Sequence, residues 1–113
     1  MIETTHTNTE EMWGVWLDGK TIYKKTVSLG TLPNATTNSI AHNISDIDQI
    51  VKIEGIARNS SGRAIPLPHV STYRADYSSV ALSADKTNIT VWPETDRSDY
   101  TGEATIYYTK TVS

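Results

Sequence analysis

Aromatic and polar side chains suited to binding a sugar gather between residues 69 and 77. A saccharide ring has an apolar face that stacks on tyrosine or tryptophan, while its hydroxyls need polar or charged groups beside that platform. A tryptophan at the base of the next polar loop offers a further platform. The residues predicted to contact a ligand are His69, Tyr73, Arg74, Asp76, Tyr77 and Trp92.

Structural roles compete with binding for every aromatic residue. The chain has no phenylalanine, so each of its aromatic rings carries a polar atom and suits a half-wet position. A contact between subunits is the main alternative role for Trp92. The aromatic residues expected in the core or at a subunit interface are Trp13, Trp16, Tyr23 and Tyr108.

Loop carboxylates raise the alternative of glycoside hydrolysis, which needs two carboxyl groups about 5–10 Å apart across the scissile bond. Such a pair could come from Asp76, Glu94, Asp96 and Asp99. Solvated carboxylates that aid solubility are the simpler interpretation, and the Gly-x-Ser-x-Gly turn of serine hydrolases is absent from the sequence. We therefore predict that the protein is not an enzyme.

A metal site would draw on the short loop after His42. Asp46 and Asp48 lie four and six residues after this histidine, and oxygen and nitrogen ligands this close could hold a cation. The regular Asp-x-Asp-x-Asp-Gly spacing is missing. We expect instead that His42 caps or hydrogen-bonds the turn at Asn43, and we predict neither a metal nor a cofactor.

Composition limits the class of protein. The chain of 113 residues has a formal charge of −3, and its basic residues are scattered, so the basic stripe of a nucleic-acid binder is lacking. The absence of cysteine excludes disulfides and thiolate zinc sites. The sequence has no apolar run long enough to span a membrane and no apolar secretory signal at its N-terminus. One domain with a single core is expected.

Strands must position the candidate residues, because β-prone residues are frequent and no apolar pattern at helical spacing occurs. Asp-Gly at residues 18–19, between two β-prone segments, predicts a hairpin with a type I′ turn. Residues 47–59 are the best candidate for the central strand. The proline-containing stretch 65–68 should lie at the edge or over the end of a sheet.

The second half of the chain alternates between strands and polar loops. In the strand predicted over 89–92, Ile89 and Val91 should face inward and Trp92 outward. Other strands are expected at 80–84 and 101–112, and loops at 69–79 and 93–99. Short strands separated by frequent turns predict an all-β fold, specifically an antiparallel, jelly-roll-like β-sandwich.

Four motifs resemble a module found at the C-terminal end of bacteriophage tail-fibre and tail-tip proteins. WLDGKTIYKKT at 16–26 is similar to the family opening W-[IV]-D-G-K-P-[IL]-Y-R-K-T. Residues 32–44 are similar to a second family pattern, L-P-N-x-T-T-K-x-[VI]-A-H-G-I, with Asn38 in place of Lys and Asn43 in place of Gly. Asparagine tolerates a left-handed backbone, so Asn43 should hold the same turn. Residues 47–62 and 96–111 resemble two further family patterns.

The resemblance implies a receptor-binding head on the virion tail, facing the host surface. It implies that residues 12–113 form this head as a homotrimer, and that residues 1–11 lead in from an upstream fibre or tail protein. The implied partner is a host cell-surface glycan, bound without catalysis. Several copies per particle would multiply the avidity of weak sites.

Other functions stay open beside this one. The domain could be a structural or trimerisation cap, with recognition done elsewhere in the fibre. It could also be a carbohydrate-binding module of a secreted bacterial protein. A depolymerising enzyme ranks last, because the sequence shows no convincing acid–base pair.

Overall fold

The structure, a computed structural model, describes residues 10–68, 79–94 and 96–111. Across these residues it contains strands and no helix, so it shows no helix that could cross a membrane. This confirms the predicted all-β class. The strands are β1 (Glu11–Val15), β2 (Thr21–Thr31), β3 (Asn38–Ala41), β4 (Ile47–Asn59), β5 (Ala64–Leu67), β6 (Val80–Ala84), β7 (Asn88–Pro93) and β8 (Tyr100–Lys110).

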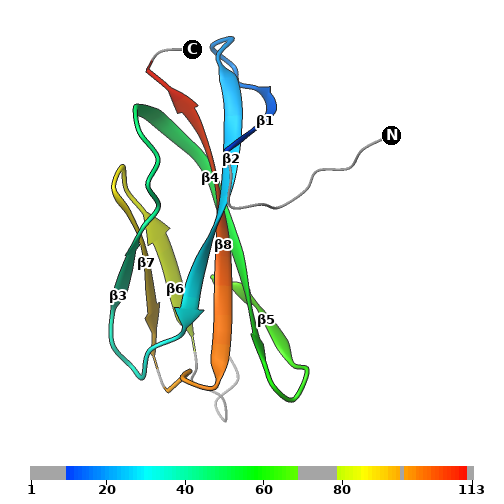
Figure 1. The fold of residues 1–113 in the computed structure, drawn as a ribbon, viewed down its shortest axis with the longest axis vertical. Coiled ribbons are helices and arrows are strands. Elements are labelled where there is room, and N and C mark those ends of the chain that lie inside the picture. The colour runs from blue at the N-terminus through cyan, green and yellow to red at the C-terminus, as the bar shows by residue number, and fades with distance from the viewer. Residues whose placement is uncertain (1–9, 69–78, 95, 112–113) are drawn as a thin grey trace.

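Two antiparallel sheets make up the described part of the chain (Figure 1). The larger has the strand order β1-β2-β8-β4-β5, and the smaller has the order β3-β7-β6. The expectation that residues 47–59 form the central strand is therefore wrong. These residues do form β4, but β8 takes the middle position because the last strand pairs with both β2 and β4.

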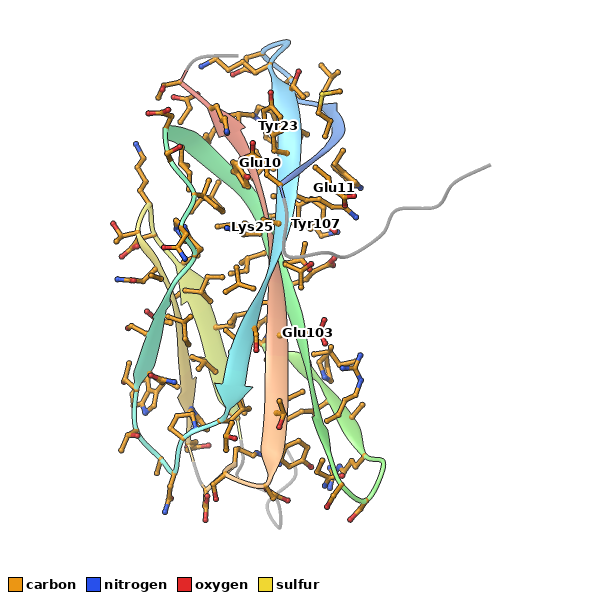
Figure 2. All side chains as sticks on the ribbon, viewed as in Figure 1. Glu10, Glu11, Tyr23, Lys25, Glu103 and Tyr107 are labelled. Atoms are coloured by element: carbon orange, nitrogen blue, oxygen red, sulfur yellow. The ribbon has the colours of Figure 1, made fainter. Side chains whose placement is uncertain are left out.

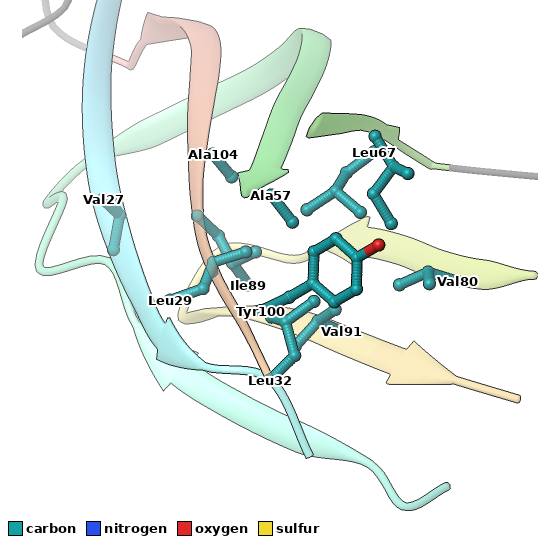
Figure 3. Close-up of a cluster of buried hydrophobic side chains, with 11 residues drawn as sticks. Val27, Leu29, Leu32, Ala57, Leu67, Val80, Ile89, Val91, Tyr100 and Ala104 are labelled. Carbon is teal, nitrogen blue, oxygen red and sulfur yellow. The ribbon is translucent and has the colours of Figure 1, made fainter. Parts of the chain in front are cut away.

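The two sheets share a hydrophobic core between their facing sides (Figure 3). The larger sheet contributes Val27 and Ala104, and the smaller contributes Ile89 and Val91, all in one buried cluster. Removing such apolar side chains from water is the main stabilising term in folding. Two sheets packed on a common core form a sandwich-like arrangement, as the strand and turn pattern predicts.

The outward direction of Trp92 follows from its neighbours in β7. Ile89 and Val91 are buried between the sheets, and successive side chains of a strand point to opposite faces. Trp92 therefore lies on the outer face of the smaller sheet, the side turned away from the core. The predicted alternation in β7 is confirmed.

The opening hairpin forms, but the predicted type I′ turn is wrong. Such a turn needs positive φ at both central residues; Gly19 has a φ of +87°, but Asp18 is not among the residues with positive φ. The Trp16 N–H donates to the Lys20 carbonyl (2.8 Å), and the Gly19 N–H donates to the Trp16 carbonyl (2.9 Å). This is a longer turn closed by a left-handed glycine. The Asp18 side chain supports it by accepting the Lys20 N–H at 3.0 Å.

A β-bulge between Met12 and Gly14 interrupts β1. Trp13 reaches Tyr107, and the two rings meet edge to face with centroids 4.8 Å apart. Tyr107 alternates with the core residues Ile106 and Tyr108, so Trp13 covers the outer face of the larger sheet. The extra residue of a bulge changes the direction of the side chains around it, which explains why Trp13 points to the outer face.

Two local predictions are confirmed. Asn43 has a φ of +58°, the left-handed conformation expected where asparagine replaces the glycine of the resembled motif. β5 lies at one edge of the larger sheet and carries the exposed Pro66, as expected for a residue that cannot donate a main-chain hydrogen bond.

Glu10 fastens the chain just before β1 to the end of β8. Its carboxylate accepts a hydrogen bond from the Tyr108 hydroxyl and another from Lys110 Nζ, the latter at 2.7 Å. Figure 2 shows Glu10 beside Tyr23, whose ring also lies under the Lys110 ammonium at 5.1 Å. Partial burial works against the charged carboxylate, but the bonds from Lys110 and Tyr108 lower the pKa of Glu10 below its ordinary 4.5.

Replacement of Glu10 by glutamine is expected to destabilise the domain at neutral pH and to have little effect in acid. Because the pKa of Glu10 is lowered in the folded state, its contribution is present above the unfolded value and disappears as pH falls through the folded value. Urea unfolding of both proteins at pH 7 and pH 3 would check this. A difference in midpoint that is equally large at both values would contradict it.

Candidate ligand-binding site

Trp92 is the one predicted ligand-binding residue that lies within the described part of the chain. It projects from β7, the middle strand of the smaller sheet, and 56% of its surface is exposed. Its cross-strand partner is Ala81 of β6. A methyl group is too short to cover an indole, so the ring stays open on that side. An exposed indole of this kind offers a flat apolar surface with one N–H donor at its rim.

A hollow of about 330 Å³ lies beside the indole and is named here the Trp92 hollow. Its size is at the small end of the roughly 300–1,000 Å³ typical of ligand pockets. Two pieces of the chain that are distant in sequence meet there, the turn before β3 and the paired strands β6 and β7. Its lining consists of Ala35, Ser79, Ala81, Trp92 and Glu94.

Hydrogen bonds between Ser79 and Glu94 hold the rim of the Trp92 hollow. The Glu94 N–H donates to the Ser79 carbonyl at 2.8 Å, and the Ser79 N–H donates to the Glu94 carboxylate at 3.4 Å. Among the described residues that line the hollow, Glu94 is the one that carries a charge. The hollow therefore offers an aromatic face and a carboxylate that can accept hydrogen bonds.

The opposite wall of the Trp92 hollow contains a backbone outlier. Ala35 has a φ of +54°, which a residue with a Cβ rarely adopts and which costs on the order of 1 kcal/mol. The preceding residue, Asn34, pairs with Asp96 in an isolated β-bridge, which holds this turn against the loop after β7. Strained residues of this kind concentrate where a surface is shaped for binding.

The other predicted site residues fall outside the described residues: His69, Tyr73, Arg74, Asp76 and Tyr77. The chain is described up to Pro68 and again from Ser79, and Ser79 itself lines the Trp92 hollow. In sequence, the predicted sugar-binding segment thus ends at Tyr77, two residues before Ser79 in the wall of the hollow.

Asp96, one of the carboxylates considered for catalysis, acts in a turn. Asp96 accepts the Ser98 N–H at 2.9 Å, and hydrogen bonds from the side chain and main chain of Ser98 lower the pKa of Asp96. A general acid in glycoside hydrolysis needs the opposite shift, since it must hold its proton near neutral pH. Asp96 is thus a structural carboxylate rather than a suitable proton donor.

His42 is a buried structural histidine. Its Nδ1 accepts the Ile44 N–H at 3.1 Å, and its Nε2 lies 2.9 Å from the Asp85 carbonyl. Because Nδ1 is an acceptor, the proton sits on Nε2 and is donated to that carbonyl. The expected hydrogen bond within the turn at Asn43 is thereby found. Both ring nitrogens are engaged, which leaves no lone pair for a cation.

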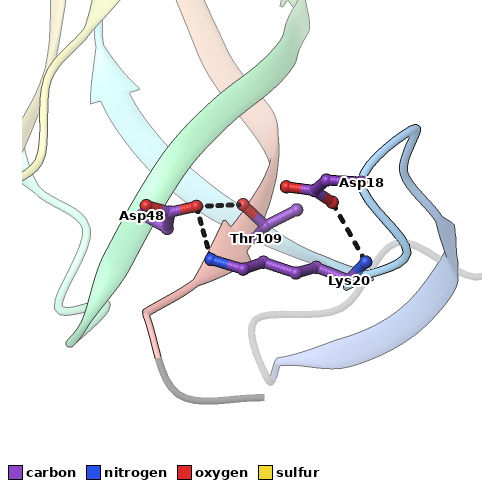
Figure 4. A network of polar contacts seen from close by, with 4 residues as sticks. All are labelled: Asp18, Lys20, Asp48 and Thr109. Carbon is purple, nitrogen blue, oxygen red and sulfur yellow. Dashed lines mark hydrogen bonds and ion pairs between the residues drawn. The ribbon is translucent and has the colours of Figure 1, made fainter.

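Asp48, the other end of the metal loop considered above, is also engaged (Figure 4). It pairs with Lys20 Nζ at 2.8 Å and accepts a hydrogen bond from the Thr109 hydroxyl at 3.4 Å. The hydrogen bond from Lys20 outweighs the opposing effect of desolvation and lowers the pKa of Asp48. Within residues 10–68, 79–94 and 96–111, no group of three metal-ligating side chains gathers.

Sequence reasoning missed the small residues that make the Trp92 hollow. Ala81 is placed opposite Trp92 by the register of β6 and β7. The turn at 85–88, in which the Asp85 side chain accepts two N–H groups, fixes that register, so pairing outward from it would have found Ala81. Ala35 joins from a distant turn, and no local signal predicts it.

No protein-family model matches the chain, and no curated protein or solved structure is significantly similar to it. What can be inferred about function therefore depends on the site geometry and on the motifs in the sequence.

Proposed function

We propose that this domain is a non-catalytic binding module that attaches to carbohydrate through the Trp92 hollow. The observation that carries the proposal is the exposed indole at the edge of a hollow that also presents a carboxylate. An apolar face for a sugar ring and an acceptor for its hydroxyls are the two elements that saccharide recognition requires.

The proposed biological setting follows from the resembled motifs. The module is the jelly-roll-like head of a phage tail fibre or tail tip, and it attaches the virion to host cell-surface glycan. Three copies per fibre, joined to an upstream fibre or tail protein, multiply weak single-site affinities through effective concentration. A carbohydrate-binding module on a secreted bacterial protein would use the same hollow in the same way.

One observation favours a second function, that of a structural cap in a fibre. Three large apolar side chains in and beside β1 are strongly exposed: Met12 at 75%, Val15 at 71% and Leu17 at 93%. A cluster of this kind suits a protein neighbour better than water. In the cap function β1 packs on the fibre, and the Trp92 hollow takes no part in adsorption.

Replacing Trp92 with alanine is expected to weaken binding to the recognised glycan by about tenfold or more, because the stacking surface is lost. A tenfold loss corresponds to about 1.4 kcal/mol, within the range of one aromatic contact plus its buried area. A glycan array of bacterial wall and capsular polysaccharides, probed with both proteins, measures this. Circular dichroism should show that the fold is unchanged.

Ser83→Ala provides a matched control. Ser83 is exposed on β6 two residues beyond Ala81, so it shares the outer face of the smaller sheet, but it does not line the Trp92 hollow. Its removal should leave binding within twofold of the natural protein. If Trp92→Ala binds as well as the natural protein, carbohydrate binding at this hollow is wrong and the cap function is preferred.

A further inference from the structure

A second hollow lies on the opposite side of the molecule, on the outer face of the larger sheet. It has a volume of about 340 Å³ and is formed by the neighbouring strands β4 and β8, from which it takes the name β4–β8 hollow. Because the two sheets face each other through the core, this hollow and the Trp92 hollow look in opposite directions. Its side-chain lining consists of Glu54, Ile56, Arg58, Glu103 and Thr105.

The charged groups around the β4–β8 hollow are paired with one another. Arg58 Nη1 donates to Glu103 at 2.9 Å, and Lys52 lies 3.4 Å from Glu54. Lys52 is not part of the lining, but its pairing with Glu54 balances the second carboxylate, so the hollow and this neighbour together carry no net charge. A polyanion or a polycation would therefore gain little here, whereas an uncharged ligand would meet balanced donors and acceptors.

The same pairing holds the polar groups in place. Glu54 accepts the Tyr107 hydroxyl at 2.7 Å, and Arg58 is fixed through Glu103. A guanidinium has five N–H donors and a carboxylate can accept about four hydrogen bonds, so both Arg58 and Glu103 keep capacity for a ligand. Groups already held by neighbours lose little freedom when they bind. Figure 2 shows Glu103 and Tyr107 along β8.

Apolar surface lies beside these polar groups. Ile56 lies between Glu54 and Arg58 along β4 and is paired with Glu103 of β8. Trp13, 44% exposed, packs on Tyr107 further along the same face. The face thus extends as a strip from Arg58, past Glu54, to an indole. A strip on which apolar and hydrogen-bonding groups alternate suits an oligosaccharide, in which each sugar ring has an apolar face and hydroxyl groups.

We propose that the β4–β8 hollow is a second binding site, selective for an uncharged, hydroxyl-rich ligand such as a neutral oligosaccharide. Arg58 and Glu103 hydrogen-bond its hydroxyls, Ile56 contacts an apolar ring face, and Trp13 meets the next unit of a longer chain. The domain then carries two sites on opposite faces and can link two polysaccharide strands. The site does not depend on Trp92.

The test uses the full chain carrying Trp92→Ala, so that binding at the other hollow cannot contribute. Cellohexaose, maltohexaose and hexa-N-acetylchitohexaose serve as neutral probes, and the anionic polymer polygalacturonate is the charged comparison. Each is titrated separately while backbone amide resonances are followed by NMR. At least one of these neutral probes should shift the amides of Ile56 and Thr105 in a saturable way. Arg58→Ala should weaken that binding by about tenfold, whereas Arg63→Ala, an exposed arginine beyond the hollow, should leave it unchanged.

Three results would overturn the proposal. One is the absence of amide shifts in β4 and β8 with all three probes. Another is a shift with polygalacturonate alone, which would mean that the site prefers charge. The third is a change of the same amides on dilution without sugar, which would make this face a contact between copies of the chain. Arg58 is in an exposed ion pair, so its replacement should not unfold the domain.

Discussion

Replacing Lys24 with methionine should raise the thermal unfolding midpoint by about 5 °C or more. Lys24 is only 3% exposed, and its Nζ has no hydrogen-bond partner among the described residues. It faces outward from β2, opposite Tyr107 of β8, in the region that Trp13 covers. A buried polar group left without a partner costs about 1–3 kcal/mol, and more when it is charged. Methionine keeps the length of the side chain without the ammonium group.

Lys25→Met is the matched control. Lys25 follows Lys24 in the same strand, but its Nζ donates to the His42 carbonyl at 2.8 Å. Removing that donor leaves a carbonyl without one partner, so this variant should be less stable than the natural protein. Differential scanning calorimetry measures both midpoints, at roughly 5 °C per kcal/mol for a domain of this size. A lower midpoint for Lys24→Met would show that the ammonium has a stabilising partner.

Gly55→Ala should destabilise the domain by about 1–3 kcal/mol or more, the range for overpacking a filled interior. A Cβ at this position would lie 2.8 Å from the Glu103 carbonyl oxygen and 3.1 Å from Leu67 Cβ. Gly55 pairs with Ala104 on one side and Leu67 on the other, so two ladders hold both neighbours in place. Neither can move without breaking main-chain hydrogen bonds.

Gly14→Ala separates this effect from the general cost of replacing a glycine. Gly14 is in β1, at the sheet edge, and nothing lies within 4 Å of an added Cβ. Its φ is not in the left-handed range, so alanine should leave stability unchanged or raise it slightly by restricting the unfolded chain. Urea unfolding of the two variants would show equal losses if the close approach at Gly55 had no role.

Most of the strands can be predicted because their signals are local. The alternation of Ile89 and Val91 with Trp92 specifies a half-buried strand, and the bounds of β4 agree with the prediction over 47–59. The order of the strands in the sheet, in contrast, cannot be predicted from local signals. Nothing near residues 100–110 says that they insert between β2 and β4, because that choice depends on pairing over long distances in the chain. The central place of β8 therefore had to come from the structure.

Only the part of the candidate site that depends on a single strand can be predicted from the sequence. Trp92 could be found because strict alternation gives its direction. Trp13 could not, because the bulge after Met12 adds a residue that breaks the alternation and carries the indole onto Tyr107. The β4–β8 hollow depends on which polar side chains of neighbouring strands lie side by side, as Arg58 and Glu103 do. That information resides in the register rather than in either strand alone.

The two edges of the larger sheet differ in what they permit. At β5, Pro66 has no N–H to offer an added strand, whereas β1 contains no proline and no other strand of the described residues pairs with its outer side. Strand addition is thus favoured on one side only. If two copies paired through their β1 strands, neither would have a free β1 edge left, and β5 would be the outermost strand at each end of the joined sheet. Such a pair is self-limiting, so pairing through the larger sheet ends at two copies rather than continuing into a fibre.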